Sequence, residues 1–237
     1  MCGIFGFVKK GDGLPDMNRL AAIAAATQQR GPHAFGFAWI DGRGRVRMFK
    51  QSGRIRDGLG LLAMTADARM LVGHCRFATH GDPADNTNNH PHPADGGWVV
   101  HNGVLRDHRE IIREYVLMPS TDCDSEVIGL LIEELEGSLA ERVIEACTIV
   151  GPSPLAVAGL WRSPQRLLVV RRGNPLYWAE RREGFYFGST SGGLGRRPPA
   201  FPDQRAISFS FRGRRTERRG FPVPEPAPTV TAQAVLF

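Results

Sequence analysis

Short apolar runs separated by turn residues dominate the first hundred positions. Runs of strand length lie at 2–8, 35–40, 70–75 and 98–101, and an Ala-rich segment at 17–29 has helical apolar spacing. A second apolar segment, 56–65, also fits a helix. The sequence Asp41-Gly42-Arg43-Gly44 separates the runs 35–40 and 45–50, which predicts a β-hairpin.

The later positions change from helical to strand patterns. Segments 107–115 and 125–135 are expected to be helices, and the second has a nearly continuous apolar stretch typical of a buried helix. Five short runs bounded by turn residues follow, at 155–161, 166–171, 176–179, 185–188 and 206–211. Strands with a few intervening helices predict an α+β fold in which helices pack outside antiparallel sheets.

The domain organisation is expected to be simple. No Pro-, Gly- or Ser-rich linker divides the chain, so residues 1–219 are expected to form one domain. The Pro-rich tail at 220–237 is expected to lie extended over that domain, because proline removes ladder donors. Residues 78–97, rich in Gly, Pro, Asn, Asp and His, are expected to form a loop that carries functional side chains.

Composition narrows the class of protein. A chain of 237 residues with 42% hydrophobic residues can bury a core without disulfides. The four cysteines form no CxxC pair, which favours reduced thiols. The start has no charged and apolar leader, and no apolar run reaches the roughly 18 residues of a membrane span, so we expect a cytoplasmic protein that does not insert into a membrane.

Positive charge is concentrated near the C-terminal end. From residue 196 onward there are 8 basic and 3 acidic residues, which accounts for +5 of the net +6. The run from Arg212 to Arg219 offers phosphate contacts, but no aromatic stacking pattern accompanies it. A solvated turn between strands, or a docking surface for an acidic partner, is favoured over nucleic-acid binding.

Cys2 is the first candidate for chemistry. If Met1 is removed, Cys2 carries both a thiol and a free α-amine, whose pKa values of about 8.5 and 7.7–8.0 let the amine take the thiol proton. Nucleophile and base would then lie on one residue. From position alone, a small buried residue at the start of a strand is the favoured interpretation of Cys2.

Further polar blocks change that balance. They follow one another along most of the chain: Met1–Gly6, Gln29–Gly36, His74–Gly81, Asn89–His92, His101–Gly103, Thr121–Glu126, Arg172–Leu176 and Phe187–Ser191. In kind and order they resemble the class II glutamine amidotransferases, the N-terminal-nucleophile glutaminases that include the amide-transfer domain of glucosamine-6-phosphate synthase. The resemblance implies a four-layer αββα sandwich with two antiparallel sheets.

The resemblance also implies a reaction. Cys2 would attack the γ-amide of L-glutamine, giving a γ-glutamyl thioester and then L-glutamate and ammonia. The side-chain amide of Asn102 and the backbone N–H of Gly103 would hold the oxyanion, and losing one such donor costs about 2.7–4 kcal/mol of barrier. Taken alone, Asn102-Gly103 is also a common type I′ turn sequence.

The amino-acid end of glutamine carries a carboxylate and an ammonium, so its binding site needs a positive and a negative side chain. By resemblance, Arg76 would bind the carboxylate and Asp124 the ammonium, with Thr79 and His80 as further contacts near the carboxylate. Without the resemblance, Arg76 and Asp124 would be taken as a surface ion pair. Arg30 is expected to order the loop near Cys2 rather than take part in the chemistry.

Three positions depart from the family pattern. Phe77 stands where tryptophan or tyrosine is usual, His33 replaces an aspartate, and Cys123 replaces a threonine. None removes a required group, although His33 leaves the loop near Cys2 open to a different arrangement.

A metal site and a cofactor are not expected. Cys75 and five histidines could suggest zinc, but their spacing is irregular and lacks a paired framework. The histidines are His74, His80, His90, His92 and His101.

The proposed partners are L-glutamine and an ammonia acceptor. Since the chain ends after the glutaminase strands, we expect a stand-alone subunit that supplies a separate synthase. A hydrolase of another γ-glutamyl amide and a non-catalytic basic module that binds nucleic acid are the alternatives. A homo-oligomer is compatible with the sequence.

Overall fold

A computed structural model describes residues 1–211 and 215–219. The expected tail at 220–237 lies outside the described residues, so its placement over the domain stays a prediction. No helix within the described part of the chain is long and apolar enough to cross a membrane.

The first sheet holds the N-terminal strand at its centre. Its six strands are ordered β3-β2-β4-β1-β10-β9, and every pair of neighbours is antiparallel. The strands are β1 (Gly3–Lys9), β2 (Ala34–Ile40), β3 (Val46–Ser52), β4 (Met70–Arg76), β9 (Tyr177–Glu180) and β10 (Gly184–Gly188). The register of β2 and β3, from Ile40 opposite Val46 to Ala34 opposite Ser52, confirms the predicted hairpin.

The second sheet is also antiparallel and six-stranded, in the order β12-β11-β8-β7-β6-β5. Its strands are β5 (His92–Ala94), β6 (Gly97–Asn102), β7 (Leu155–Arg162), β8 (Gln165–Arg172), β11 (Arg205–Ser210) and β12 (Arg215–Arg219).

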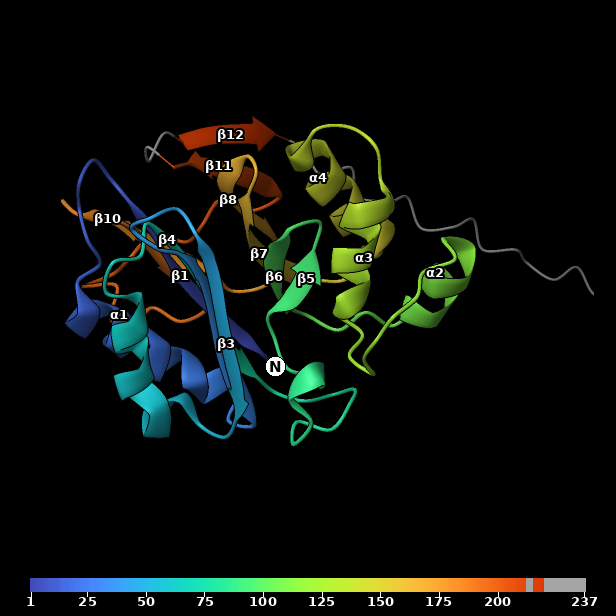
Figure 1. Cartoon of the computed structure of the whole chain (residues 1–237), viewed down its shortest axis with the longest axis horizontal. Coiled ribbons are helices and arrows are strands. Elements are labelled where there is room, and N and C mark those ends of the chain that lie inside the picture. Colours follow the sequence, from blue (N-terminus) through green and yellow to red (C-terminus); the bar gives the residue numbers. More distant parts are fainter. Residues whose placement is uncertain (212–214, 220–237) are drawn as a thin grey trace, which may run out of the picture.

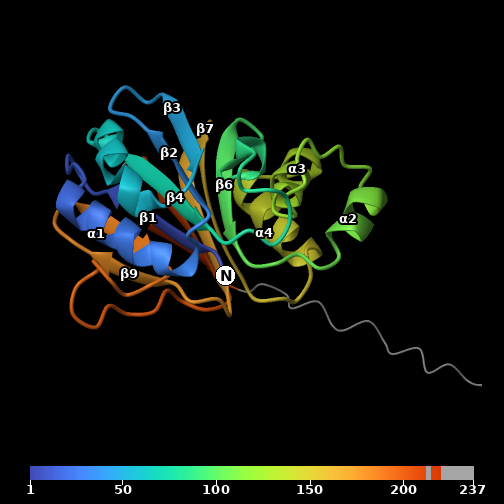
Figure 2. The ribbon, with the colours of Figure 1, turned by 90° about the horizontal axis from the view of Figure 1, so that it is seen from below.

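Helices cover the outer face of each sheet, as Figures 1 and 2 show. The helix α1 (Met17–Thr27) and the 3₁₀ helix η2 (Ile55–Thr65) pack on the first sheet, and α3 (Glu126–Glu134) and α4 (Leu139–Ile149) on the second. The shorter helix α2 (His108–Glu114) lies beyond α3 (Figure 2). The predicted four-layer αββα sandwich is therefore confirmed.

Burial on both faces explains why the strands appear as continuous apolar runs. In β1, Ile4 and Val8 belong to the core between the two sheets, whereas Phe5 and Phe7 belong to the core under α1. Successive side chains of a strand point to opposite faces of the sheet. When both faces are covered, both sets of side chains are apolar, and the usual alternation of apolar and polar residues is absent. The strand predicted at 2–8 is confirmed, and the structure places it at the centre of the first sheet.

Several sequence predictions need correction. Residues 56–65 form a 3₁₀ helix rather than an α-helix, with a kink at Gly58. The helix α4 and the strand β12 were not predicted. A capping box at Ser138 and Glu141 begins α4, a signal that the sequence did carry. The expected solvated turn at 212–219 is wrong for 215–219, which pair with β11 as β12; residues 212–214 lie outside the described part.

The predicted loop at 78–97 is more structured than expected. It contains the 3₁₀ helix η3 (Asn86–Asn88) and the short strand β5, which pairs with β6. Three residues of strand give too little alternation to be recognised in a polar segment.

Candidate active site

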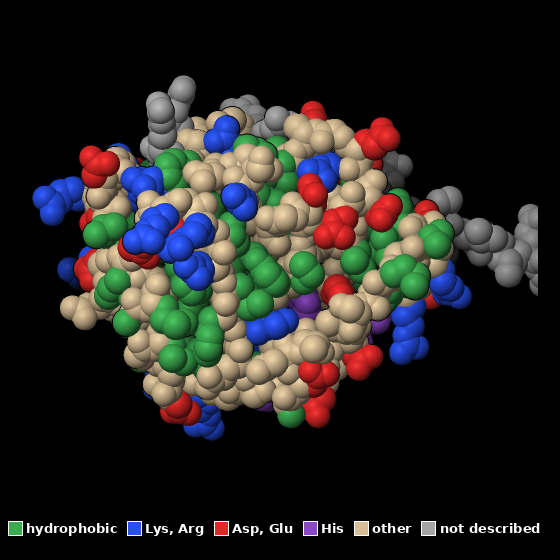
Figure 3. Space-filling view, viewed as in Figure 1, with side chains coloured by type: hydrophobic (Ala, Val, Ile, Leu, Met, Phe, Trp, Pro, Cys, Tyr) green, Lys and Arg blue, Asp and Glu red, His purple; other side chains and the backbone are tan. Residues whose placement is uncertain are grey.

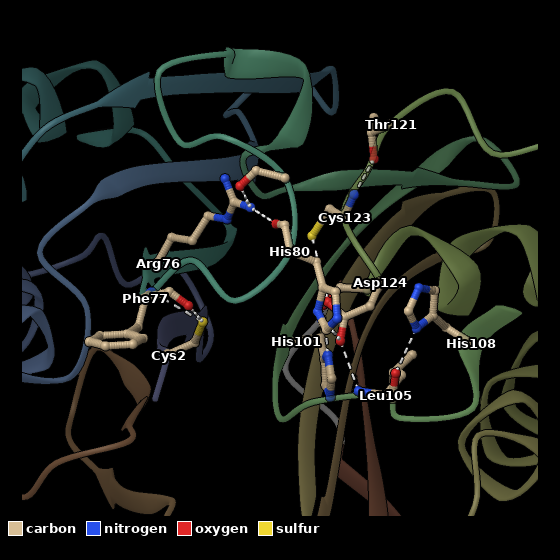
Figure 4. Close-up of polar contacts among 12 residues, drawn as sticks. Cys2, Arg76, Phe77, His80, His101, Leu105, His108, Thr121, Cys123 and Asp124 are labelled. Atoms are coloured by element: carbon tan, nitrogen blue, oxygen red, sulfur yellow. Dashed lines mark hydrogen bonds and ion pairs between the residues drawn. The ribbon is translucent and has the colours of Figure 1, made fainter.

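Cys2 lies directly before β1, at the end of the first sheet that faces the loop after β4. The Cys2 side chain is buried, and its Sγ accepts a hydrogen bond from the backbone N–H of Phe77 at 3.3 Å (Figure 4). The Nε of Arg30 donates to the carbonyl of Cys2 at 2.8 Å. Arg30 therefore holds the backbone at this position, and its supporting role near Cys2 stays a prediction.

The residue after Cys2 has no room for a side chain. A Cβ on Gly3 would lie 2.5 Å from Cγ2 of Thr27 and 3.0 Å from its carbonyl oxygen. This close approach lets the end of α1 pack against the start of β1.

The environment of the thiol raises its pKa. Burial is the main cause, and the charge of Asp124 acts in the same direction. The hydrogen bond from Phe77 and the charges of the N-terminal amine and Arg76 act in the opposite direction. The thiol therefore feels the charges of both proposed glutamine-binding residues, and it needs a base before it can act as a nucleophile.

The chain's first residue lies near Asn102-Gly103. Met1 is 67% exposed, and it lines a pocket of about 240 Å³ together with Gly103, Pro154 and Asn174. The start of the chain and the residue that follows β6 thus line the same pocket.

Asn102 is the last residue of β6, and its side chain is fully buried. Neither its amide nitrogen nor its amide oxygen has a hydrogen-bond partner among the described residues. Neither Asn102 nor Gly103 has the positive φ that a type I′ turn requires, so the turn alternative is wrong. A buried amide without partners is costly unless something binds it, typically about 1–3 kcal/mol for each unsatisfied group.

The backbone around this amide is held from two sides. Asn174 donates its Nδ2 to the carbonyl of Asn102 at 2.6 Å and to that of Pro154 at 3.1 Å. A Cβ on Gly103 would lie 2.3 Å from Nε2 of His101, so only glycine fits there. Sequence reasoning gave Asn174 no role, although it lies in one of the quoted blocks.

Arg76, at the end of β4, is buried and already has three acceptors. Its guanidinium donates to the carbonyl of His80, to that of Gly81 at 2.9 Å and to Oδ1 of Asn89 at 2.7 Å (Figure 4). In this arrangement Arg76 holds the loop after β4 in place. To bind a carboxylate it must exchange at least one of these partners.

Asp124 lies opposite, in the segment before α3, and is also buried. Its Oδ2 accepts the backbone N–H of Leu105 at 2.8 Å and lies 3.7 Å from Nδ1 of His80 (Figure 4). Arg76 and Asp124 form no ion pair with each other in the described structure, so the surface-pair alternative is wrong. Thr79 is exposed on the loop between them.

A pocket of about 410 Å³ opens beside His80. His108 and Cys123 also line it. The loop after β4 therefore has space on the side of α2 and α3 into which its side chains can move.

The family departures at 33 and 77 act together. The rings of His33 and Phe77 pack at a centroid distance of 4.9 Å, and Nδ1 of His33 accepts the backbone N–H of Ala78 at 3.0 Å. His33 thus anchors the first residues of the loop that Arg76 holds further along.

Four histidines are buried beneath this loop, and burial lowers their pKa values. The pKa falls well below the usual range for His74 and His90, to about 3 for His92 and to about 4 for His101. His74 Nε2 lies 3.0 Å from the carbonyl of His101, and His101 Nδ1 lies 2.8 Å from Oγ of Ser125.

His90 and His92 differ from the other two. Among the described residues, neither ring nitrogen of either side chain has a hydrogen-bond partner. Their donor atoms and Sγ of Cys123 all lie within 4.8 Å of one another, so this group could hold a metal ion. Cys123 follows His92 by 31 residues and His90 by 33, and no local spacing could have grouped it with the histidines.

Ser189 is a second residue that sequence reasoning left without a role. Its Oγ accepts the backbone N–H of Ile4 at 2.9 Å, and its own N–H donates to the carbonyl of Ile4 at 2.8 Å. Ser189, which directly follows β10, therefore holds the beginning of β1 in place.

Comparisons with known proteins show which family the chain resembles. No protein-family model matches the chain. The glutamine–fructose-6-phosphate aminotransferase of Aquifex aeolicus is 34% identical over 184 residues, which cover 74% of this chain and 30% of that protein. The enzymes of the same name from Thermotoga maritima and Escherichia coli K12 are 35% and 32% identical and are matched over 29% of their length. The chain thus spans less than a third of these relatives.

Solved structures share the fold. A glutamine phosphoribosylpyrophosphate amidotransferase from B. subtilis superimposes with a TM-score of 0.72, covering 92% of this chain and 49% of that one, at 17% identity. A structure described as the allosteric regulatory enzyme of purine biosynthesis gives a TM-score of 0.74, with the same coverage and identity.

Proposed function

The chain carries a class II glutamine amidotransferase domain, of the type that uses an N-terminal cysteine as nucleophile, and from this premise we propose that it hydrolyses L-glutamine to L-glutamate and ammonia. The observation that carries the proposal is the buried side chain of Asn102, whose amide has no hydrogen-bond partner among the described residues. The next residue, Gly103, lines the pocket that also contains Met1.

In the proposed reaction the Cys2 thiolate attacks the γ-carbonyl carbon of glutamine. The Asn102 amide and the Gly103 N–H stabilise the oxyanion, since donors fixed in advance of the reaction lower the barrier most. When the intermediate collapses, the C–N bond breaks and ammonia leaves with the proton taken from the thiol. Water then attacks the thioester carbon and gives a proton to the α-amine, which is neutral again once ammonia has left. The C–S bond breaks, and the thiolate takes that proton back from the amine.

The base is the α-amine of Cys2, which becomes free only when Met1 is removed. An α-amine has a pKa near 7.7–8.0, so at neutral pH a useful fraction can accept the thiol proton. Removal of Met1 also empties part of the pocket that it shares with Gly103, in which the reacting amide would lie. Proteolytic processing and substrate access are thus coupled.

Binding of the amino-acid end requires a rearrangement. Asp124 accepts one backbone N–H and has a second carboxylate oxygen facing Ser125 at 3.4 Å, which leaves acceptor capacity for an ammonium. The substrate carboxylate replaces loop carbonyls as acceptor for Arg76, and Thr79 and His80 follow the loop toward it. The exchange trades neutral acceptors for a charged one, which makes stronger hydrogen bonds.

A second part of the proposal concerns the molecule that accepts the ammonia. The relatives are named as aminotransferases, and their match with this chain covers under a third of their length. We place the acceptor chemistry in a separate synthase that would bind this domain. Affinity purification followed by a glutamine-dependent amination assay tests this part independently of glutaminase activity.

The central test uses the nucleophile. Replacement Cys2→Ala is expected to lower the rate of glutamate release by at least about 10³-fold, because no other group can form the thioester. Cys147→Ala is the control, since Cys147 is also a buried thiol and lies on α4. A diazo-ketone analogue of glutamine, followed by peptide mapping, should label Cys2 alone.

Intact-mass analysis supplies the second readout. Active protein should lack Met1, and protein that retains Met1 should be inactive and unlabelled. Full activity with Met1 in place would contradict the proposed base, and an unchanged rate in Cys2→Ala would overturn the proposed function as a whole.

A further inference from the structure

Three soft or borderline donors meet in the interior next to Asp124. They are the imidazoles of His90 and His92 and the thiol of Cys123, and their donor atoms all lie within 4.8 Å of one another. All three residues are buried, with 2% or less exposed for the histidines and 5% for Cys123. On the face shown in Figure 3 only small patches of histidine surface are visible.

The two imidazoles have no partner within the described part of the chain. All four of their ring nitrogens are enclosed by protein and make no hydrogen bond. A neutral imidazole has one N–H donor and one lone pair, and buried groups of this kind are nearly always paired. Two neighbouring exceptions at one place indicate that something absent from the polypeptide satisfies them.

The ring geometry selects which histidines can share an ion. His90 and His92 meet edge to face, with centroids 4.5 Å apart and planes at 71°, so lone pairs in the two ring planes can converge on one point. His74 stacks on His90 at 3.9 Å with planes at 29°, and stacked rings direct their lone pairs side by side instead.

His101 is excluded for a different reason. Its Nε2 faces Gly103, where a Cβ would approach to 2.3 Å, and its Nδ1 is bonded to Ser125. It therefore belongs to the candidate active site.

The charges around the group are balanced. The ammonium of Lys50 lies close by, donating to the carbonyl of Asn89 at 2.8 Å and to that of Pro91 at 3.5 Å, and Arg76 donates to Asn89. Asp124 and Glu126 lie on the other side, in the segment that carries Cys123. A cation bound by a thiolate would add one net positive charge between two fixed cations and two fixed anions.

We propose that His90, His92 and Cys123 form a binding site for a single divalent transition-metal ion of the zinc class, with a water molecule as fourth ligand. Zinc takes nitrogen at about 2.0–2.1 Å and thiolate at about 2.3 Å, which puts tetrahedral donors about 3.5 Å apart. Closing the present separations requires side-chain shifts of about 1 Å at most. This departs from the sequence expectation of no metal, which considered the histidines with Cys75.

The site joins two segments that both flank the candidate active site. His90 and His92 end the loop that Arg76 holds, and Cys123 precedes Asp124 in the segment leading into α3. A hydrogen bond from the N–H of Asp122 to Oδ1 of Asn88, at 2.8 Å, already links them. A bound ion would fix the position of Asp124 relative to the loop, which is a positioning role.

Metal content tests the proposal directly. Protein from cells grown with added zinc, passed through a chelator-containing column, should retain about one zinc per chain by mass spectrometry of the metal. Cys123→Thr, which installs the residue that resemblance makes typical there, should retain less than about a fifth of that amount. The control Cys147→Ala removes a buried thiol on α4 that is not part of this donor group and should keep the wild-type content.

Cobalt gives a second readout that does not depend on any variant folding. Wild-type protein produced in cobalt-supplemented medium should show the near-ultraviolet thiolate-to-cobalt charge-transfer band and the intense visible bands of tetrahedral cobalt. Wild-type protein without metal, or without the thiolate band, would overturn the proposal. So would equal metal content in folded Cys123→Thr. Metal-free protein that still hydrolyses glutamine overturns this proposal alone and leaves the proposed function intact.

Discussion

The two sheets contribute differently to the candidate site. On the β4 side the two arginines of the site are partnered: Arg76 has three acceptors, and Arg30 donates to the carbonyl of Cys2. Nδ1 of His74 and Nδ1 of His80 are the exceptions on this side. On the β6 side Asn102 and Nε2 of His101 are buried without partners in the described structure. Unpaired buried polar groups are costly. We therefore expect the arginines of the β4 side to stabilise the loop and backbone, and the unpaired groups of the β6 side to bind a ligand.

This difference separates stability from activity at the level of single residues. A side chain that already has partners contributes to folding and must give up contacts to bind a ligand. One without partners contributes little to folding and is ready to bind. The predictions below test whether substitutions on the β4 side mainly lower stability and substitutions on the β6 side mainly lower activity.

The largest effect in this comparison is expected at Asn102. Replacement Asn102→Ala should lower kcat for glutamine hydrolysis by about 10²–10³-fold, or about 2.7–4 kcal/mol, because one oxyanion donor is lost. The free energy of unfolding should fall by less than the usual cost of a buried truncation, since no hydrogen bond is lost. Kinetics and urea denaturation measure the two quantities.

Arg76→Gln is the counterpart on the partnered side. It should lower the free energy of unfolding by about 2–4 kcal/mol, because it leaves the carbonyls of His80 and Gly81 and the amide oxygen of Asn89 without their donor. If Asn102→Ala destabilises the fold more than Arg76→Gln does, the division between the two sides is wrong.

The sequence predicted the fold to a large extent, because the strands are short, apolar and bounded by turns. The hairpin at 41–44 could be assigned from its turn residues, and the buried strands from runs such as 2–8. The exceptions are elements with weak local signals. β12 forms in an Arg-rich stretch because β11 offers it a partner edge, and pairing of that kind is not encoded in the run itself.

The sequence pointed to individual residues of the site but not to the contacts between them. The resemblance pointed to Cys2, Asn102 and Asp124, but it carried no information about which polar groups are already satisfied. That Arg76 is occupied by its own loop follows from the folded path of residues 77–89. The meeting of Cys123 with His90 depends on how β5 and α3 pack, which no spacing along the chain specifies.

The pH dependence of the free energy of unfolding tests the β6 side through His101, and the expected effect is of intermediate size. Burial holds the pKa of His101 at about 4, below its usual value of 6.5, although Asp124 opposes this. Between those values the unfolded chain binds a proton that the folded chain does not. The free energy of unfolding should therefore fall as the pH decreases from about 6.5 to about 4, by up to about 1.4 kcal/mol per pH unit for this residue.

A variant isolates this contribution. His101→Asn removes one titrating ring and should reduce the slope of the stability curve in that window by the share of one residue, while His74, His90 and His92 keep theirs. Asp41→Asn should change the curve only at lower pH, because hydrogen bonds from Arg45 and Arg43 outweigh burial and hold the pKa of Asp41 at about 2. An unchanged slope in His101→Asn would contradict a neutral, buried His101.

The smallest expected effect lies on the partnered side, at His33. Replacement His33→Ala removes the acceptor for the N–H of Ala78 and the ring packed on Phe77, which loosens the start of the loop but leaves the hydrogen bonds of Arg76 in place. Because the loss is about one hydrogen bond, or about 0.5–1.5 kcal/mol, KM for glutamine should rise about 2–10-fold with little change in kcat. His33→Asn keeps an acceptor and should restore much of the affinity. A fall in kcat of the size expected for Asn102→Ala would mean that the loop acts on the chemical step, and the partnered side would then be more than a scaffold.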